Sequence, residues 1–469
     1  MAAAVRASGI GLLTAALMAC NGGVLETPAP AAQGREEAAL ADTLPIVFVH
    51  GAAGSAAQYQ AQSMRFVANG VPADKIHTFE YDAGVNGIVL AAGGQLLLPL
   101  YQFLLNVTEQ HGVDQVYLVG HSLGTIVSTE YLASGFLTTP LPVAAPANLV
   151  AKFVSIDGAV SPVCPGLVPC IGIFDGDSSV GMGADNTYIQ NQAHVEVATS
   201  AESFEAQFAF FYGQRPQVVE IARQGAEVLV SGRAVTFPEN SGRPDPLLEI
   251  WAVDSATGQR TAAAPVETLI PDTEGFWGPT RLRTDTHYEF LLLASDSVPH
   301  HFYMPRFLRD TEHVRLLSGP DDSDTRSNTN LSDNHVAVVV SRMREWFGDH
   351  PAAGNDIIEI STRSPSLGDQ PVVNAITTAV GNDTIGLHIH DDAATPGQTT
   401  LEPLPYFPDQ AFQTGMDVYM PATEPPDGTV RMRLIPRGRA EFTQTIHFPN
   451  WASSGHRVSV GYNDFDSAE

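Results

Sequence analysis

One short stretch, residues 116–124, constrains the fold more than any other part of the chain. It reads VYLVGHSLG, an apolar run that ends in a G-x-S-x-G turn, and residues 125–132 have the apolar spacing of a helix. A strand that passes through a tight turn into a helix aims the turn's serine out of the top of a sheet, and the flanking glycines leave room for the turn. The stretch predicts Ser122 as a nucleophile; a serine in an ordinary strand-to-helix turn is the alternative.

The length and charge of the chain limit its class. Its 469 residues exceed what one compact core usually holds, so we expect two or three domains. Acidic residues number 52 and basic residues 24, which gives a formal net charge of -28. This charge argues against nucleic acid as a partner and favours a strongly hydrated surface.

The N-terminal segment, residues 1–20, predicts a signal peptide and hence export. Its apolar run, residues 10–19, is too short to span a membrane as a mature helix. The run leads into LMAC, which resembles the lipobox of bacterial lipoproteins, in which the cysteine becomes the lipidated N-terminus. This resemblance implies that Cys20 carries a lipid and anchors the chain to the cell envelope. Cleavage after Ala19, with release of an extracellular protein, is the alternative.

Composition and hydrophobic period divide the rest of the chain. Residues 21–42 are rich in Ala, Pro, Gly and Glu and predict a flexible linker. Residues 43–216 alternate apolar strands with helical spacing, which predicts an α/β domain with a mostly parallel sheet. Short alternating strands beyond it predict β-sandwich-like modules over 217–352 and 353–469. A helix-like stretch, residues 336–347, interrupts this second half.

A serine hydroxyl is a weak nucleophile at neutral pH and needs a base and a carboxylate that orients that base. After Ser122, the sequence offers Asp157 at the end of an apolar strand and His194 before a helix. Both partners are expected at the carboxyl edge of the sheet, in the order Ser, Asp, His. In this arrangement Ser122 attacks an acyl carbon, His194 moves the proton, and Asp157 steadies the imidazolium.

Other residues compete for the roles of acid and base. His335 also precedes the helix-like stretch but lies beyond several predicted strands, and His121 is excluded as the elbow's own outward neighbour. The rival acids lie in a predicted loop over residues 158–187, where turn-forming or solvated aspartates are common: Asp175, Asp177 and Asp185. Asp157 and His194 are therefore the favoured pair.

The reaction also needs two N–H donors for the oxyanion that develops on the substrate. One is the backbone amide of Leu123, at the start of the helix after Ser122. The other is an amide from the loop after the first strand, where Ala52 follows His50-Gly51. Backbone donors require only small residues here, and the sequence supplies them; a plain strand-ending turn is the alternative.

Several motifs together resemble the secreted triacylglycerol lipases of the α/β-hydrolase superfamily, especially the archaeal type with a large C-terminal β domain. The motifs are VHGAAG at 49–54, GHSLG at 120–124, SIDG at 155–158 and HVEVATS at 194–200. The resemblance covers residues 45–213, and the second half matches by architecture only. It implies Ser122, Asp157 and His194 as the triad, Ala52 and Leu123 as the oxyanion hole, and no organic cofactor. Relatives often carry a larger apolar residue where Ala52 stands, so the width of the acyl pocket is open.

Two further segments suggest features around this site. Residues 82–98 are apolar yet broken by glycines, which fits either a lid that opens on a lipid surface or a buried connecting helix. Cys164 and Cys170 lie six residues apart, and an exported chain permits a disulfide between them. Two cysteines without a local histidine make a poor zinc site.

No metal is predicted. His388 with His390, and the acidic run Asp321–Asp324, offer too few ligands and are better interpreted as solvated surface. The sequence therefore predicts a carboxylic ester hydrolase, a lipase acting on acylglycerols. A short-chain esterase or polyester depolymerase is the first alternative, and an envelope binding lipoprotein with a vestigial hydrolase domain is the second. The sequence leaves the oligomeric state open.

Overall fold

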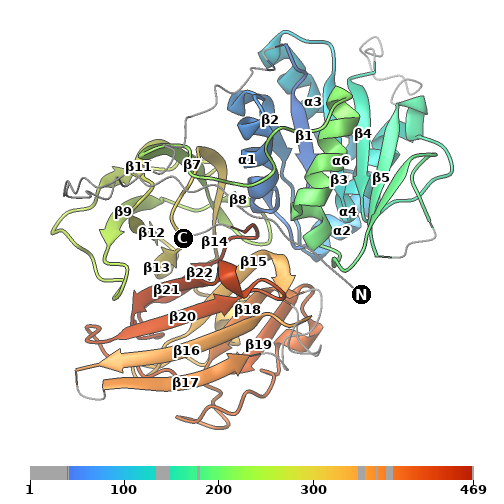
Figure 1. Cartoon of the computed structure of the whole chain (residues 1–469). Coiled ribbons are helices and arrows are strands. Elements are labelled where there is room, and N and C mark those ends of the chain that lie inside the picture. Colours follow the sequence, from blue (N-terminus) through green and yellow to red (C-terminus); the bar gives the residue numbers. More distant parts are fainter. Residues whose placement is uncertain are drawn as a thin grey trace, which may run out of the picture. The chain divides into compact units, whose positions relative to one another are not determined.

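Figure 1 shows the computed structural model of the chain. It describes residues 40, 42–133, 148–176, 180–346, 354–365, 368–376 and 384–466, of which 368–376 are described by backbone alone. The predicted signal peptide with Cys20, most of the predicted linker and the candidate Asp177 lie outside the described residues.

The N-terminal domain is built on a parallel sheet. Within the described residues it has six strands in the order β2-β1-β3-β4-β5-β6, and every neighbouring pair is parallel. Apolar runs such as Ile46–Val49 are buried on both faces, as expected for a sheet covered by helices on each side. The strands are β1 Ile46–Val49, β2 Ile76–Phe79, β3 Val116–His121, β4 Val150–Ile156, β5 Cys170–Asp175 and β6 Asn186–Ile189.

Helices cover both faces of this sheet. On one face, Phe66 and Phe204 of α1 and α6 pack against the side of the sheet that bears Phe48. On the other face, Leu100 and Val127 of α3 and α4 join the core around Val47. The helices are η1 Ala56–Tyr59, α1 Gln60–Ala68, η2 Ala73–Lys75, α2 Val85–Ala92, α3 Leu97–His111, α4 Leu123–Ala133, η3 Pro165–Leu167, α5 Glu196–Thr199 and α6 Ala201–Tyr212.

The strand order places a topological switch point between β1 and β3. The chain after β1 enters α1 on one face of the sheet, whereas the chain after β3 enters α4 on the opposite face. Where neighbouring strands send their connections to opposite faces, a crevice opens outside their carboxyl ends, and ligands bind there. The predicted oxyanion loop and Ser122 follow these two strands, so the topology brings them together.

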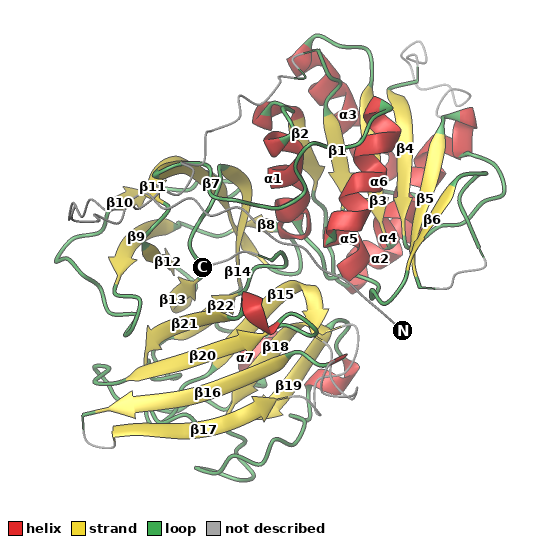
Figure 2. Ribbon diagram, viewed as in Figure 1, coloured by secondary structure: helices red, strands yellow, loops and turns green. Residues whose placement is uncertain are grey.

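The second half of the chain is mostly strand (Figure 2). The part from residue 226 to 320 contributes β9, β10, β12 and β13 to one sheet and β7, β8, β11 and β14 to another. These strands are β7 Glu227–Thr236, β8 Ser241–Gly242, β9 Leu247–Val253, β10 Glu267–Leu269, β11 Phe276–Arg283, β12 His287–Ala294, β13 Ser297–Tyr303 and β14 Thr311–Ser318. We call this part the first β module.

The part from residue 324 to 466, the second β module, packs two groups of strands around one apolar core. One group is β22-β15-β18-β19 and the other is β17-β16-β20-β21. Its elements are α7 Asp324–Ser327, β15 Val338–Trp346, β16 Ile357–Ser364, β17 Gly368–Ile376, β18 Thr384–His390, η5 Phe407–Asp409, β19 Gln413–Asp417, β20 Thr429–Ile435, η6 Ala440–Phe442, β21 Gln444–Pro449 and β22 Arg457–Gly461.

The structure corrects two local predictions. Residues 338–346 of the predicted helix form strand β15, in which Val338, Val340 and Arg342 are buried with a period of two. Three consecutive valines favour a strand because branching at Cβ restricts their side chains in a helix. The predicted loop over 158–187 contains β5 and the start of β6, because an apolar run is embedded among its glycines and prolines.

The correction to β15 also affects the division of the β half. β15 pairs with β18 and β22, so it belongs with the strands that the sequence assigned to 353–469. β22 pairs in parallel with β13 as well, which joins strands of both modules into one sheet. A boundary at residue 352 therefore separates β15 from its pairing partners.

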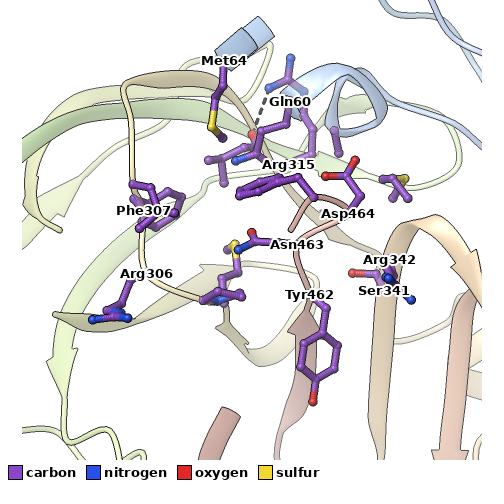
Figure 3. A pocket seen from close by; sticks show the side chains of 18 residues that line it. Gln60, Met64, Arg306, Phe307, Arg315, Ser341, Arg342, Tyr462, Asn463 and Asp464 are labelled. Atoms are coloured by element: carbon purple, nitrogen blue, oxygen red, sulfur yellow. Dashed lines mark hydrogen bonds between the residues drawn. The ribbon is translucent and has the colours of Figure 1, made fainter. Parts of the chain in front are cut away.

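A cavity of about 80 Å³ lies where α1 meets both β modules (Figure 3). Met64 comes from α1, Arg315 from β14, Ser341 from β15 and Asp464 from the C-terminal segment. None of the triad candidates lines this cavity. No single described helix has the length and apolar character needed to cross a membrane. The helices α2 and α3 reach that length and apolar character only when taken together, and they are bent by 89° at the break between them.

Candidate active site

Ser122 occupies a sharp turn between β3 and α4. Its φ of 51° lies in the left-handed region, which is rare for a residue with a side chain and marks a turn fixed by its surroundings. A Cβ on Gly124 would lie 2.2 Å from the carbonyl oxygen of Val49, and one on Gly120 would lie 2.7 Å from that of Gly124. Both flanking positions thus require glycine, and the geometry is that of a nucleophile elbow.

Asp157 and His194 meet at the carboxyl edge of the sheet. The Asp157 Oδ2 atom lies 2.5 Å from the Nδ1 atom of His194, which donates to it. The second carboxylate oxygen accepts from the backbone amide of Asp175 at 3.3 Å. Burial opposes ionisation of Asp157, but the hydrogen bond and charge of His194 outweigh it and lower the pKa of Asp157. The acid is therefore ionised at neutral pH and orients the imidazole.

His121 connects the elbow to His194. Its Nε2 atom donates to the carbonyl oxygen of His194 at 2.8 Å, and its Nδ1 atom lies 2.7 Å from the side-chain nitrogen of Gln58. Burial and the nearby charge of His194 lower the pKa of His121 to about 3, so its ring is neutral and carries its proton on Nε2. The sequence excluded His121 as the base but missed this link, because nothing in the local pattern reveals it.

The loop after β1 lies directly against the elbow. A Cβ on Gly51 would come 2.9 Å from Ser122 Cβ, so only glycine fits at this contact. The loop is held by a hydrogen bond of 2.8 Å from the amide of Ala53 to the carbonyl of Ala83 and by stacking of the buried His50 ring on Tyr81. Its conformation is therefore set before any ligand arrives.

Two backbone amides beside Ser122 are available to a ligand. Among the described residues, neither the Ala52 amide nor the Leu123 amide donates a hydrogen bond to another group. Backbone donors are nearly always paired where water is excluded, so two open donors beside a nucleophile form a candidate oxyanion hole. These are the two residues that the sequence predicted for this role.

The other described candidates for acid and base make different contacts. His335 is buried in the second β module, with its Nδ1 atom 3.4 Å from the carbonyl of Val336. Asp175 contacts Asp157 through its backbone amide, and Asp185 accepts from Gly172 through its backbone carbonyl. Of the residues weighed for acid and base, the structure brings Asp157 and His194 together.

The other predicted sites have clear structural positions. Cys164 and Cys170 form a disulfide. His388 hydrogen-bonds to Gln413 at 2.8 Å and stacks on Phe407, and Asp321 pairs with arginines including Arg457. Within the described residues, no group of three or more His, Cys, Asp or Glu side chains is arranged to hold a metal ion.

The segment 82–98 contains α2 and the start of α3. The α2 helix buries Ala91 in the core but leaves Val85 and Val89 exposed, by 78% and 62%. At its base, the amide of Ala83 donates to the carbonyl of Pro238 in the first β module. The segment is thus a partly buried helix with an apolar outer face beside the β1 loop.

The chain matches families whose descriptions name lipases. The family model for class 2 lipases matches residues 43–172, and the model for a lipase C-terminal domain matches residues 226–320. A further model, described as a C-terminal domain, matches residues 324–466. No curated protein sequence matches significantly.

Solved structures show weak similarity. The lipase BlEst2 of Bacillus licheniformis in its propeptide form shares 11% identity, covering 88% of this chain and 94% of that one, with a TM-score of 0.25. Phospholipase PlaB of Legionella pneumophila shares 7% identity, covering 54% and 85%, with a TM-score of 0.26. The family matches, taken with the parallel sheet and the β half that follows it, support an α/β-hydrolase lipase with a C-terminal β domain.

Proposed function

We propose that the protein hydrolyses carboxylic esters of lipids, acylglycerols in particular, by a Ser-His-Asp mechanism. The observation that carries this proposal is the 2.5 Å contact between Asp157 and His194 at the carboxyl edge of the sheet that presents Ser122. A positioned acid, a base and a nucleophile at one edge of the sheet are the parts that acyl transfer requires.

Each residue has a defined part in the reaction. Ser122 Oγ attacks the acyl carbon while His194 Nε2 accepts its proton, and the amides of Ala52 and Leu123 stabilise the oxyanion. His194 then gives the proton to the leaving alcohol, which leaves an acyl group on Ser122. Water, deprotonated by His194, attacks the acyl-enzyme, and His194 returns this proton to Ser122 Oγ as the acid leaves. Asp157 stays ionised throughout and holds the imidazole in the required tautomer.

The surroundings of the site favour a lipid substrate. Apolar side chains are exposed on segments that follow the carboxyl ends of several strands of the sheet: Val85, Ile88, Val89, Ile126, Val160, Val163 and Leu167. Exposed apolar groups near the edge of a sheet where ligands bind suit the acyl chains of a lipid. Export with a lipid on Cys20 would place this domain at a membrane surface.

Covalent labelling tests the mechanism. A fluorophosphonate should modify the wild-type chain at Ser122, and Ser122→Ala should abolish both the adduct and roughly 10⁴-fold or more of the turnover. Ser128→Ala, on the helix α4 that follows Ser122, is the matched control and should label normally. A Ser122→Ala chain that still reacts would refute the nucleophile, and absence of any adduct would favour a vestigial hydrolase domain.

Substrate rank tests the lipid assignment. We expect activity to rise with acyl-chain length and to increase sharply when a long-chain ester passes its solubility limit. A jump of this kind would support the segment 82–98 as a mobile lid. Highest activity on short soluble esters, with no jump at the interface, would instead assign the protein as a short-chain esterase.

A further inference from the structure

The second β module contacts the residues that follow His194 directly. The Glu345 Oε2 atom, on strand β15, accepts hydrogen bonds from the backbone amides of Val195 at 2.9 Å and Glu196 at 3.1 Å. The Glu345 side chain therefore reaches from the second module to the two residues next to the proposed base. Hydrogen bonds to a carboxylate are about twice as strong as neutral ones.

The backbone at Glu345 adopts an unusual conformation. Glu345 is fully buried and has a φ of 66°, in the left-handed region that a glutamate rarely adopts. The pairing of β15 with β18 shifts register between Ser341 and Trp346, so Glu345 lies in an irregular part of the strand. Irregularities of this kind redirect a side chain, and a strained residue persists only where its surroundings hold it.

An ion-pair network holds the side chain of Glu196, in the turn that follows His194. The Glu196 carboxylate accepts from Arg344 at 2.6 Å and from Arg437 at 2.6 Å, and both arginines belong to the second module. Arg437 also pairs with Asp356. The backbone and the side chain of the turn after His194 are thus both fixed by this module.

The hydrolase domain also holds His194. His121 donates to the His194 carbonyl, and Asp157 accepts from its imidazole. The ring of Phe412, again from the second module, stacks on the His194 ring with 6.0 Å between centroids and an interplanar angle of 18°. Two elements of the second module therefore meet the base or its neighbours.

We propose that Glu345 is a positioning residue for His194, through which the second β module becomes a working part of the catalytic centre. The inference rests on the proposed function, because it assigns a role relative to the base. Catalysis depends steeply on the placement of the reacting groups, and a displacement of about 1 Å can reduce turnover about a hundredfold. The carboxylate of Glu345 restrains this placement by fixing the amides of residues 195 and 196.

Glycine and glutamine at this position separate the carboxylate from the fold. Glu345→Gly removes the carboxylate, and glycine accepts the positive φ without strain. Glu345→Gln keeps one acceptor oxygen in a side chain of nearly the same shape as glutamate. Glu359→Gln is the matched control, because Glu359 pairs with Arg433 at 2.8 Å inside the same module and away from His194.

The experiment measures kcat and KM on a soluble short-chain ester, with active sites counted by the end point of fluorophosphonate labelling. We expect Glu345→Gly to lower kcat per labelled site about tenfold or more and to slow labelling in parallel, with KM changed less than about twofold. Glu345→Gln should recover most of this loss, and Glu359→Gln should match the wild type.

The outcomes separate the two proposals. An unchanged kcat per labelled site in Glu345→Gly, even with a lower melting temperature, would overturn the positioning role and leave Glu345 as a purely structural cap. A fall in kcat that Glu359→Gln reproduces would overturn it as well. Labelling that persists in Ser122→Ala would instead refute the proposed function, and the inference would fall with it.

Discussion

Each of the two β modules binds the hydrolase domain through its own cluster of ion pairs. At the first module, Glu80 beyond β2 receives Arg315 at 2.9 Å, Arg233 at 2.8 Å and the amide of Ala56 at 2.8 Å. At the second module, Glu196 receives Arg344 and Arg437. In both places a buried carboxylate of the hydrolase domain is neutralised by two arginines of a β module.

The two clusters differ in what lies next to them. Glu80 precedes Tyr81, which stacks on His50 at the base of the β1 loop and contacts no triad residue in its described interactions. Glu196 lies two residues from His194. Glu345, on β15 of the second module, accepts a hydrogen bond from the amide of Val195 between them. We infer that the first cluster chiefly stabilises the fold, whereas the second stabilises the fold and the geometry of the base.

The largest loss of stability is expected from Glu80→Ala. Burial alone would raise the pKa of Glu80, but Arg315 and Arg233 outweigh it and hold this pKa well below its usual value. The substitution leaves two arginines without their carboxylate and should lower the free energy of unfolding by about 3–5 kcal/mol. Denaturant titration measures this loss. A change in the free energy of unfolding below about 1 kcal/mol would contradict the assignment of Glu80 as the main contributor to the stability of this contact.

The pH dependence of the same pair has a definite sign. A carboxylate whose pKa is lowered by folding contributes stability above its unfolded pKa, and this contribution is lost as the pH falls. The wild type should therefore lose more stability than Glu80→Ala between about pH 5 and pH 2. Parallel titration of both chains in this range gives the difference directly.

An intermediate effect, of a different kind, is expected from Glu196→Gln. Glutamine retains an acceptor but loses the charge that faces Arg344 and Arg437, so we expect a loss of about 2 kcal/mol. Unlike Glu80→Ala, this change should also lower kcat several-fold, because the turn after His194 loses a restraint. Turnover per labelled site, measured where both variants remain folded, checks the contrast. Equal turnover in the two variants would remove the distinction between the clusters.

The sequence predicted the parts of this structure that short-range patterns encode. Buried apolar runs such as Ile46–Val49 identified the parallel sheet, and the G-x-S-x-G turn identified the position of Ser122. The order Ser, Asp, His then selected Asp157 and His194, which the structure places in contact. Each of these inferences depends on residues close together in the chain or on a motif with a fixed order.

Long-range contacts were beyond the same reasoning. Glu345 lies 149 residues from Glu196 in the chain. The sequence predicts a helix for the segment that contains Glu345, because the apolar residues of 336–347 also fit a helical period, whereas residues 338–346 form a strand. The buried Arg342 within β15 offers no local sign of its partner Asp356. Contacts formed by tertiary packing decide these positions, and a single sequence does not record them.

A smaller effect is expected at the junction cavity, from Asp464→Asn. Burial raises the pKa of Asp464 to about 6, although Arg65 opposes the shift, and Arg342 and Arg344 also act on it. Among the described groups, its Oδ2 atom has no hydrogen-bond partner. The folded chain therefore binds a proton that the unfolded chain loses near pH 4, and stability falls as the pH rises from about 4 to 6.

The asparagine variant isolates this cost. At pH 8 it should be more stable than the wild type by about 1–2 kcal/mol, and at pH 4 the two should agree, because Asp464 is then protonated. Thermal unfolding at both pH values makes the comparison. A stabilisation of equal size at pH 4 would show that the gain comes from packing, not from removal of a buried charge.

The smallest effect is expected at the exposed pair of Glu359 and Arg433. The two side chains are about one-third exposed, at 31% and 38%, and lie 2.8 Å apart on neighbouring strands of the second module. Solvent and salt screen such a pair, so Glu359→Gln should cost about 0.2–1 kcal/mol, and less in high salt. The pair has the same chemistry as those at Glu80 and Glu196 but much less burial. If the stability loss of Glu359→Gln matched those of Glu80→Ala and Glu196→Gln, burial would not explain why the two clusters at the hydrolase domain are strong. The difference between a cluster that stabilises the fold and one that also stabilises the geometry of the base would then need another cause.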